Sequence, residues 1–140
     1  MKKNDNVAVI IDTSCLMYRS LYSKRDGDKD HPVARKTIRY ILDVIDKFKP
    51  KYLVLSLDSN RDAVYRKKLS KEYKSNRSER PAEIEDGLKV IKEFCDLFEI
   101  TYLKYSTQES DDIIASCVKK FEENNIKSVN LLTFIFYSFL

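Results

Sequence analysis

A short, unbroken apolar run near the start of the chain constrains its fold more than any other feature. Residues Val7–Ile11 are all apolar and end at Asp12, and the run is far too short to span a membrane. Strands that are buried on both faces have such continuous apolar runs, and they occur in parallel sheets covered by helices on both sides. The run therefore predicts an inner strand of a covered sheet.

Strand and helix patterns alternate along the rest of the 140 residues, a length that suits one domain. Further strands are predicted at Tyr52–Leu57, Ile100–Leu103 and Ser128–Thr133. Two helices are predicted over 13–22 and 109–124. A third is predicted from apolar residues at helical spacing, Ile38, Ile41, Leu42, Ile45 and Phe48. A fourth is predicted to begin at Pro81 and to bury Ile84, Leu88, Ile91, Cys95 and Phe98. This alternation predicts an α/β fold: a four-stranded parallel sheet with helices on both faces.

Basic residues are concentrated in residues 61–80, which hold eight basic and three acidic residues, whereas the whole chain has a formal charge of only +4. The segment has too few apolar positions to pack on a core, so we expect it to project into solvent. A basic projection on a neutral body is typical of a phosphate-binding protein. A solvated charged helix without a ligand is the alternative.

Cysteine and histidine usage excludes several classes of site. The three cysteines are widely spaced, which excludes a self-contained disulfide framework, and Cys95 and Cys117 fall at apolar helical positions where core thiols are expected. His31, the single histidine, stands before Pro32 in a charged loop with no cysteine nearby, so we expect neither a histidine-based zinc site nor a Ser–His–Asp triad. The chain has neither a signal peptide pattern nor a membrane span, and we expect a reducing, cytoplasmic location.

Acidic residues follow the predicted strands. Asp12 ends the first strand, Asp58 closes the second, and Glu109, Asp111 and Asp112 open the helix after the third. Because the site of a parallel α/β sheet lies beyond the carboxyl ends of its strands, these five carboxylates are expected to converge on one edge. Mg²⁺ and Mn²⁺ prefer carboxylate oxygens, and such an ion activates water and stabilises a phosphate under attack.

Each acid also has a purely local interpretation. Asp12 suits a loop or an N-cap, Asp58 suits a turn, and Asp111 and Asp112 complement the dipole of the helix that they open. Ser106 and Glu109 have the spacing of a capping box.

Five short motifs stand in order along residues 7–133. They are Ile-Ile-Asp-Thr-Ser-Cys-Leu-Met-Tyr-Arg over 10–19, Leu-Asp over 57–58, Tyr-Arg and Tyr-Lys-Ser-Asn-Arg within 65–77, Pro-Ala-Glu-Ile over 81–84, and Gln-Glu-Ser-Asp-Asp-Ile-Ile-Ala over 108–115. Their order and spacing resemble the N-terminal, resolvase-like (PIN-like) domain of 5′-3′ exonucleases. That family includes the 5′-nuclease domain of bacterial DNA polymerase I and the flap endonucleases.

The resemblance implies a nuclease of DNA replication and repair that hydrolyses phosphodiester bonds near 5′ ends or flaps of DNA, with RNA–DNA as a further substrate. It implies that Mg²⁺ or Mn²⁺ is held by Asp12, Asp58, Glu109, Asp111 and Asp112. It also implies that nucleic acid is contacted by Arg19 and by a helical arch carrying Arg66, Tyr73, Lys74 and Arg77. In that family pattern Lys74 and Arg77 also serve catalysis, and Tyr73 stacks on a base.

The last seven residues, 134–140, depart from the family pattern. The family continues after its fourth strand with further acids and a helix–hairpin–helix element, whereas this chain continues with an apolar, aromatic tail. We therefore expect a family domain over 1–133 with impaired activity, from truncation or a frameshift, and a partner that supplies the missing half. The alternatives are a genuine short protein whose apolar end extends the sheet or buries in a dimer, a non-catalytic nucleic-acid-binding remnant, and a PIN-like ribonuclease.

Overall fold

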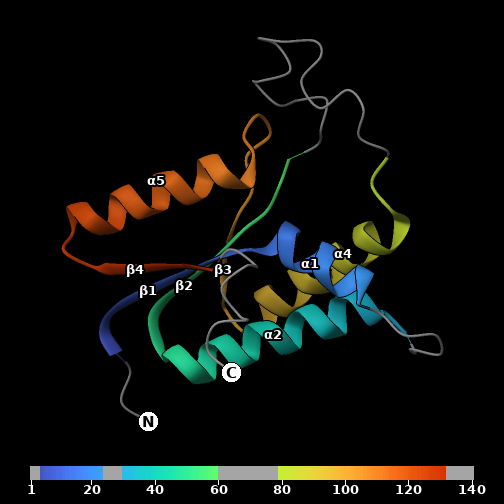
Figure 1. Cartoon of the computed structure of the whole chain (residues 1–140), viewed down its shortest axis with the longest axis horizontal. Coiled ribbons are helices and arrows are strands. Elements are labelled where there is room, and N and C mark those ends of the chain that lie inside the picture. Colours follow the sequence, from blue (N-terminus) through green and yellow to red (C-terminus); the bar gives the residue numbers. More distant parts are fainter. Residues whose placement is uncertain (1–3, 24–29, 60–78, 132–140) are drawn as a thin grey trace.

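The computed structural model of the chain describes residues 4–23, 30–59 and 79–131 (Figure 1). In these ranges the elements run β1 (Asn4–Asp12), α1 (Thr13–Tyr22), α2 (Pro32–Phe48), β2 (Pro50–Ser56), α4 (Ala82–Leu97), β3 (Thr101–Leu103), α5 (Ser110–Glu123) and β4 (Lys127–Leu131). The alternation of strand and helix predicted from the sequence is confirmed. Most of the basic segment 61–80 and the tail 134–140 lie outside the described residues.

The four strands form one parallel sheet in the order β3-β2-β1-β4. β1 is an inner strand, with Ile10 opposite Val54 of β2 on one side and Asn130 of β4 on the other. Ala8, Val9 and Ile10 are completely buried, as the continuous apolar run predicts. Because all strands are parallel, their carboxyl ends lie at the same edge of the sheet.

Helices cover both faces of the sheet, as expected (Figure 1). On one face, Val9, Ile11 and Leu55 belong to a core shared with α1, α2 and α4. On the other face, Ile10 and Val54 pack with Ile114 of α5. The two sets alternate along β1 because successive side chains of a strand point to opposite faces.

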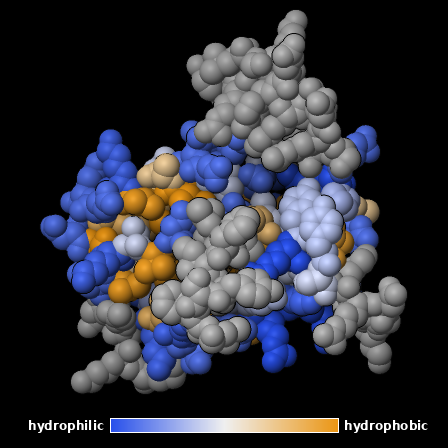
Figure 2. Space-filling model, in the orientation of Figure 1, coloured by the Kyte–Doolittle hydropathy of each residue, from blue (hydrophilic) through white to orange (hydrophobic). Residues whose placement is uncertain are grey.

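The coloured part of the face shown in Figure 2 is mostly polar, with apolar residues exposed in an area on its left-hand side, where β1, β4 and α5 lie in Figure 1. β4 is an edge strand of the described sheet, and its residues Ser128–Asn130 are only half-buried. Among the helices of residues 4–23, 30–59 and 79–131, none is long and apolar enough to cross a membrane.

Two apolar positions predicted to face the core are exposed instead. Leu42 is 48% exposed. The face of α2 that packs inward carries Val33, Ala34 and Thr37, and Leu42 lies on a different side of the helix. Phe98 is 65% exposed, because it is the C-cap of α4 and leaves the helical face, packing its ring on Phe94.

The prediction of a core thiol is confirmed for Cys95, which is 1% exposed, and burial together with the nearby Asp96 carboxylate raises the pKa of its thiol to about 11. Cys117 is half-buried against the α5 core. Pro81 precedes its helix as the N-cap, so the helix begins one residue later than predicted.

Gly87 lies where α4 crosses α1 and α2. A β-carbon on Gly87 would stand 3.2 Å from Met17 Cε and 3.4 Å from Val33 Cγ1. Both neighbours are buried, so they have little room to move. Glycine inside a helix costs about 1 kcal/mol relative to alanine, and here it permits the close approach of three helices.

Replacing Gly87 with leucine is expected to lower the free energy of unfolding by about 1–3 kcal/mol, because Met17 and Val33 must move to admit the side chain. Urea unfolding followed by circular dichroism measures the change. Lys89→Leu, on the exposed side of the same helix, is the matched control and should shift stability by no more than about 0.5 kcal/mol. Equal effects of the two substitutions would contradict the packing assigned to Gly87.

Candidate metal centre

Asp12 joins the sheet to the first helix. It is the last residue of β1 and the N-cap of α1, where its Oδ1 accepts a hydrogen bond of 2.9 Å from the Cys15 backbone N–H. The N-cap interpretation of Asp12 is therefore correct, and it coexists with the predicted position at the carboxyl edge of the sheet. The hydrogen bond fixes the carboxylate where β1 ends.

Asp58 connects three segments at the same edge. Its backbone N–H donates to Ser14 Oγ of α1 at 3.1 Å, and its Oδ1 accepts from the Ser110 backbone N–H at 2.8 Å. Ser110 is the first residue of α5, so the Asp58 carboxylate also caps that helix from another part of the chain. These contacts bring the end of β2 to the starts of α1 and α5.

A buried pair of serines lies below these acids. Ser56 Oγ donates to the Ile11 carbonyl at 3.1 Å, and Ser56 and Ser110 share a short hydrogen bond between their hydroxyls. Both serines are almost completely buried. Reasoning from the sequence missed both of them. The available signal was Ser56 itself, a polar residue within the apolar run that closes β2.

The negative charges of this site interact with one another. The pKa of the Asp12 carboxyl is raised above its ordinary value of 3.8, chiefly by burial and also by the charges of Asp58 and Asp111. Hydrogen bonds from the Cys15 backbone and the Ser110 side chain oppose this shift. Asp12, Asp58 and Asp111 therefore come from three separate segments into one negative environment, as the positions of these acids predict.

Glu109 and Asp112 are engaged in holding the end of α5. Glu109 is the N-cap, its side chain accepts from the Asp112 backbone N–H, and Asp112 Oδ2 accepts from the Glu109 N–H at 3.4 Å. The predicted capping box of Ser106 with Glu109 is wrong, because the helix begins at Ser110 and the reciprocal pair is Glu109 with Asp112. Within the residues described, no group of three or more His, Cys, Asp or Glu side chains is arranged to hold a metal ion.

The predicted nucleic-acid contacts have different outcomes. The Arg19 guanidinium lies over the ring of Tyr40, 5.4 Å from its centroid, so it contacts α2. Its role as a phosphate contact stays a prediction. Arg66, Tyr73, Lys74 and Arg77 lie outside the described residues, and their roles also stay predictions.

The chain belongs to the family described as the 5′-3′ exonuclease, N-terminal resolvase-like domain, which matches residues 7–134. It is 26% identical over 125 residues to DNA polymerase I of Caldicellulosiruptor bescii, covering 86% of this chain and 15% of that protein. It is 30% identical over 122 residues to the 5′-3′ exonuclease of Aquifex aeolicus, covering 84% of this chain and 42% of the relative. The chain thus spans less than half the length of these relatives.

Solved structures share the fold. A 5′-exonuclease of bacteriophage T5 with bound divalent zinc ions superposes with a TM-score of 0.66 at 19% identity, covering 89% of this chain and 48% of that one. The flap endonuclease of the same phage, in a pseudo-enzyme–product complex with DNA and metal ions, has a TM-score of 0.69 at 20% identity, covering 89% and 47%. These likenesses confirm the predicted PIN-like α/β architecture.

The raised pKa of Asp12 predicts a stability effect with a definite sign. The unfolded chain ionises Asp12 near 3.8 and the folded chain ionises it at higher pH, so stability falls as pH rises through this interval and stays reduced at pH 7. Asp12→Asn keeps the N-cap and removes the charge, so it should be more stable than the unsubstituted chain in urea at pH 7 with EDTA. Asp12→Ala loses the cap and should be about 1 kcal/mol less stable than Asp12→Asn.

The gain from Asp12→Asn should shrink as the pH is lowered toward 3.8, where the native carboxyl is already protonated. If Asp12→Asn is less stable than the unsubstituted chain at pH 7, the negative charges do not destabilise the fold as described.

A second prediction concerns the link between Asp111 and Asp12. Asp111→Asn should lower the pKa of Asp12, because it removes one of the two neighbouring charges that raise it. Carboxyl ¹³C NMR titration in EDTA measures this pKa directly. Asp43→Asn on the exposed side of α2 is the control, and an unchanged Asp12 pKa in Asp111→Asn would contradict the shared environment.

Proposed function

We propose that this chain carries the metal-binding half of a 5′-3′ exonuclease or flap-endonuclease site that hydrolyses phosphodiester bonds of DNA. The observation that carries the proposal is that the charges of Asp58 and Asp111, from two other segments, act on Asp12 at the carboxyl edge of the sheet, where Asp58 is tied to the start of α5. Membership of the 5′-3′ exonuclease family and the names of the relatives support the class of reaction. We propose DNA with a 5′ end or flap as the substrate, and RNA–DNA as a further substrate.

The chemistry of the donors, carboxylate oxygens, suits a hard divalent cation such as Mg²⁺ or Mn²⁺, although the acids of the described residues do not form a ready-made group of three metal ligands, so binding requires them to move together. The three acids supply carboxylate oxygens, and the pKa of Asp12 is raised partly because its neighbours are also negative. When bound, the cation supplies Lewis-acid chemistry to the water and phosphate that react. The chain's own residues orient the ligands: Cys15 N–H holds Asp12, and Ser110 N–H holds Asp58.

Glu109 and Asp112 remain proposed ligands of this site. Their carboxylates bond to each other's backbone, so as ligands they must leave the capping box or use their second oxygen atoms. We further propose that Arg19, Arg66, Lys74 and Arg77 position the nucleic-acid backbone, that Lys74 and Arg77 assist catalysis, and that Tyr73 stacks on a base. The proposed location is the cytoplasm.

A second candidate function is a non-catalytic nucleic-acid-binding fragment. The capping box favours it, because Glu109 and Asp112 each accept a hydrogen bond from the other's backbone N–H. In that case a separate partner supplies the rest of the catalytic site. The two candidates differ in whether the chain alone turns over substrate.

Cleavage of an end-labelled 5′-flap DNA by the purified chain, with Mg²⁺ or Mn²⁺, tests the proposal. The expected product is metal-dependent and falls about 100-fold or more in Asp12→Asn, since even residues that only support a metal ligand cost 10–100-fold when changed. Asp43→Asn is the matched control and should cleave like the unsubstituted chain.

Absence of product, with DNA still retained in a salt-dependent manner, would overturn hydrolysis by this chain in favour of the binding fragment. Cleavage of single-stranded RNA in preference to flap DNA would replace the proposal with a PIN-like ribonuclease.

A further inference from the structure

Lys104 lies just past the carboxyl end of the edge strand β3. The Leu57 backbone N–H donates to the Leu103 carbonyl at 2.9 Å, which continues the pairing of Ser56 with Leu103. Lys104 is therefore placed beside the backbone that leads into Asp58, on the side of the sheet away from Asp12. Its side chain is exposed.

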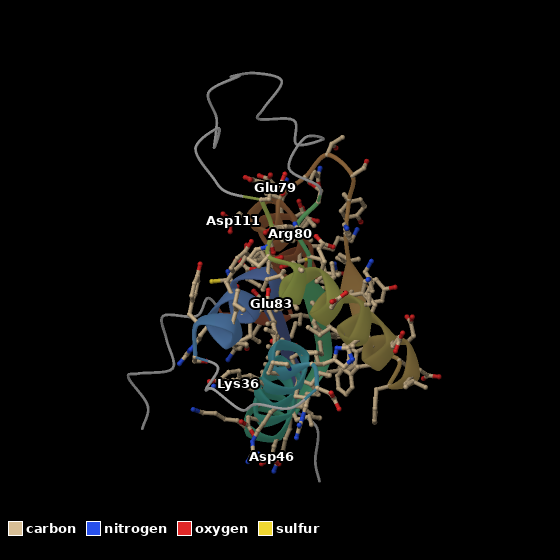
Figure 3. The ribbon with its side chains drawn as sticks, turned by 90° about the vertical axis from the view of Figure 1, so that its right-hand side faces the viewer. Lys36, Asp46, Glu79, Arg80, Glu83 and Asp111 are labelled. Carbon is tan, nitrogen blue, oxygen red and sulfur yellow. The ribbon has the colours of Figure 1, made fainter. Side chains whose placement is uncertain are left out.

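Arg80 comes to the same region from the residues that precede α4. Its Nη2 donates to the Ser59 carbonyl at 3.3 Å, and its Nη1 donates to Glu85 Oε1 at 2.9 Å. The Arg80 side chain is only 15% exposed, so these contacts hold it next to the residue that follows Asp58. Figure 3 shows Arg80 and Asp111 at the same end of the molecule, with Asp46 at the opposite end.

Lys92 completes a cluster of positive charges. It lies on α4 two helical turns after Glu85, on the same side of the helix. The pKa of the Lys104 ammonium group is lowered, chiefly by partial loss of hydration of this otherwise exposed side chain and also by the positive charges of Lys92 and Arg80, while Glu85 opposes the shift. Glu85, the carboxylate that acts on Lys104, is itself paired with Arg80.

We propose that Arg80, Lys92 and Lys104, here called the β3-edge cluster, bind the phosphate backbone of a nucleic-acid strand alongside the acidic site. The inference rests on the proposed function for its ligand class and extends the binding surface beyond the basic segment and Arg19. Three cations from three segments repel one another, and a polyanion relieves that repulsion. Phosphate contacts of this kind position a strand without reading its bases.

The position of the cluster favours nucleic acid over a free anion. Arg80 contacts the residue next to Asp58, so a strand held by the cluster also runs past the proposed metal ligands. Consecutive phosphates of one strand can reach both places, whereas a single small anion occupies only one. The cluster therefore supplies a cationic flank to the three acids at the centre of the edge.

The test measures DNA binding without cleavage. Fluorescence anisotropy of a labelled 5′-flap DNA is followed in EDTA at several KCl concentrations for Lys92→Gln/Lys104→Gln. Each lost phosphate contact should reduce the slope of log K against log salt by about 0.9, so the double variant should bind more weakly with a slope smaller by up to about 2. Arg80 is left unchanged because it also ties Ser59 to the start of α4.

The matched control is Lys119→Gln/Lys120→Gln, which removes the same charge from exposed positions of α5 on the other face of the sheet. This control should have the same slope of log K against log salt as the unsubstituted chain. Lys92→Arg/Lys104→Arg keeps both charges and should bind DNA as the unsubstituted chain does. Equal losses in the two Gln pairs, or no loss in either, would overturn the cluster as a binding site. Urea unfolding of each variant verifies that it is folded.

The two proposals fail separately. A chain that does not cleave flap DNA but loses salt-dependent binding in Lys92→Gln/Lys104→Gln refutes hydrolysis and supports the cluster. A chain that cleaves in an Asp12-dependent manner and binds equally well with both Gln pairs supports hydrolysis and refutes the cluster.

Discussion

The hydrogen bond from the Ser110 backbone N–H to Asp58 Oδ1 is the interaction on which the site depends. It joins the end of β2 to the first turn of α5, across 52 residues of sequence. The buried Ser56 hydroxyl continues this connection to Ser110 and to the Ile11 carbonyl of β1. A charged acceptor bound to a helix N-terminus is among the stronger hydrogen bonds available to a protein. The hydrogen bond between Ser110 and Asp58 thereby holds acids of separate segments at one edge of the sheet.

The same edge shows a conflict between folding and function. Asp12 stabilises α1 as its N-cap, yet burial and the neighbouring Asp58 and Asp111 raise the pKa of its carboxyl and disfavour its charge. A carboxyl group serving only as a cap has no need of negative neighbours. Such unfavourable electrostatics are typical of functional sites, where a ligand supplies the compensating charge.

Charge is arranged in two zones along the carboxyl edge. Acids from β1, the end of β2 and α5 occupy its centre, while Arg80 and Lys104 lie toward the β3 side, where the charge of Lys92 on α4 also acts on Lys104. Glu109 and Asp112 belong to the acidic zone by sequence but use their carboxylates to cap α5. Family membership covers residues 7–134, so both zones lie within the part of the chain that matches the 5′-3′ exonucleases.

The sequence by itself determined the inner strand at Val7–Ile11, the order of strands and helices, and the placement of Asp12, Asp58 and Asp111 at strand or helix ends, because apolar runs and helical spacing are local patterns. Tertiary structure decided which groups meet. It paired Ser56 with Ser110, rotated Leu42 out of the core, moved the capping box to Glu109 and Asp112, and brought Lys92 and Arg80 to Lys104. These contacts depend on how helices pack across the sheet, and residues far apart in sequence leave no local periodicity from which to predict them.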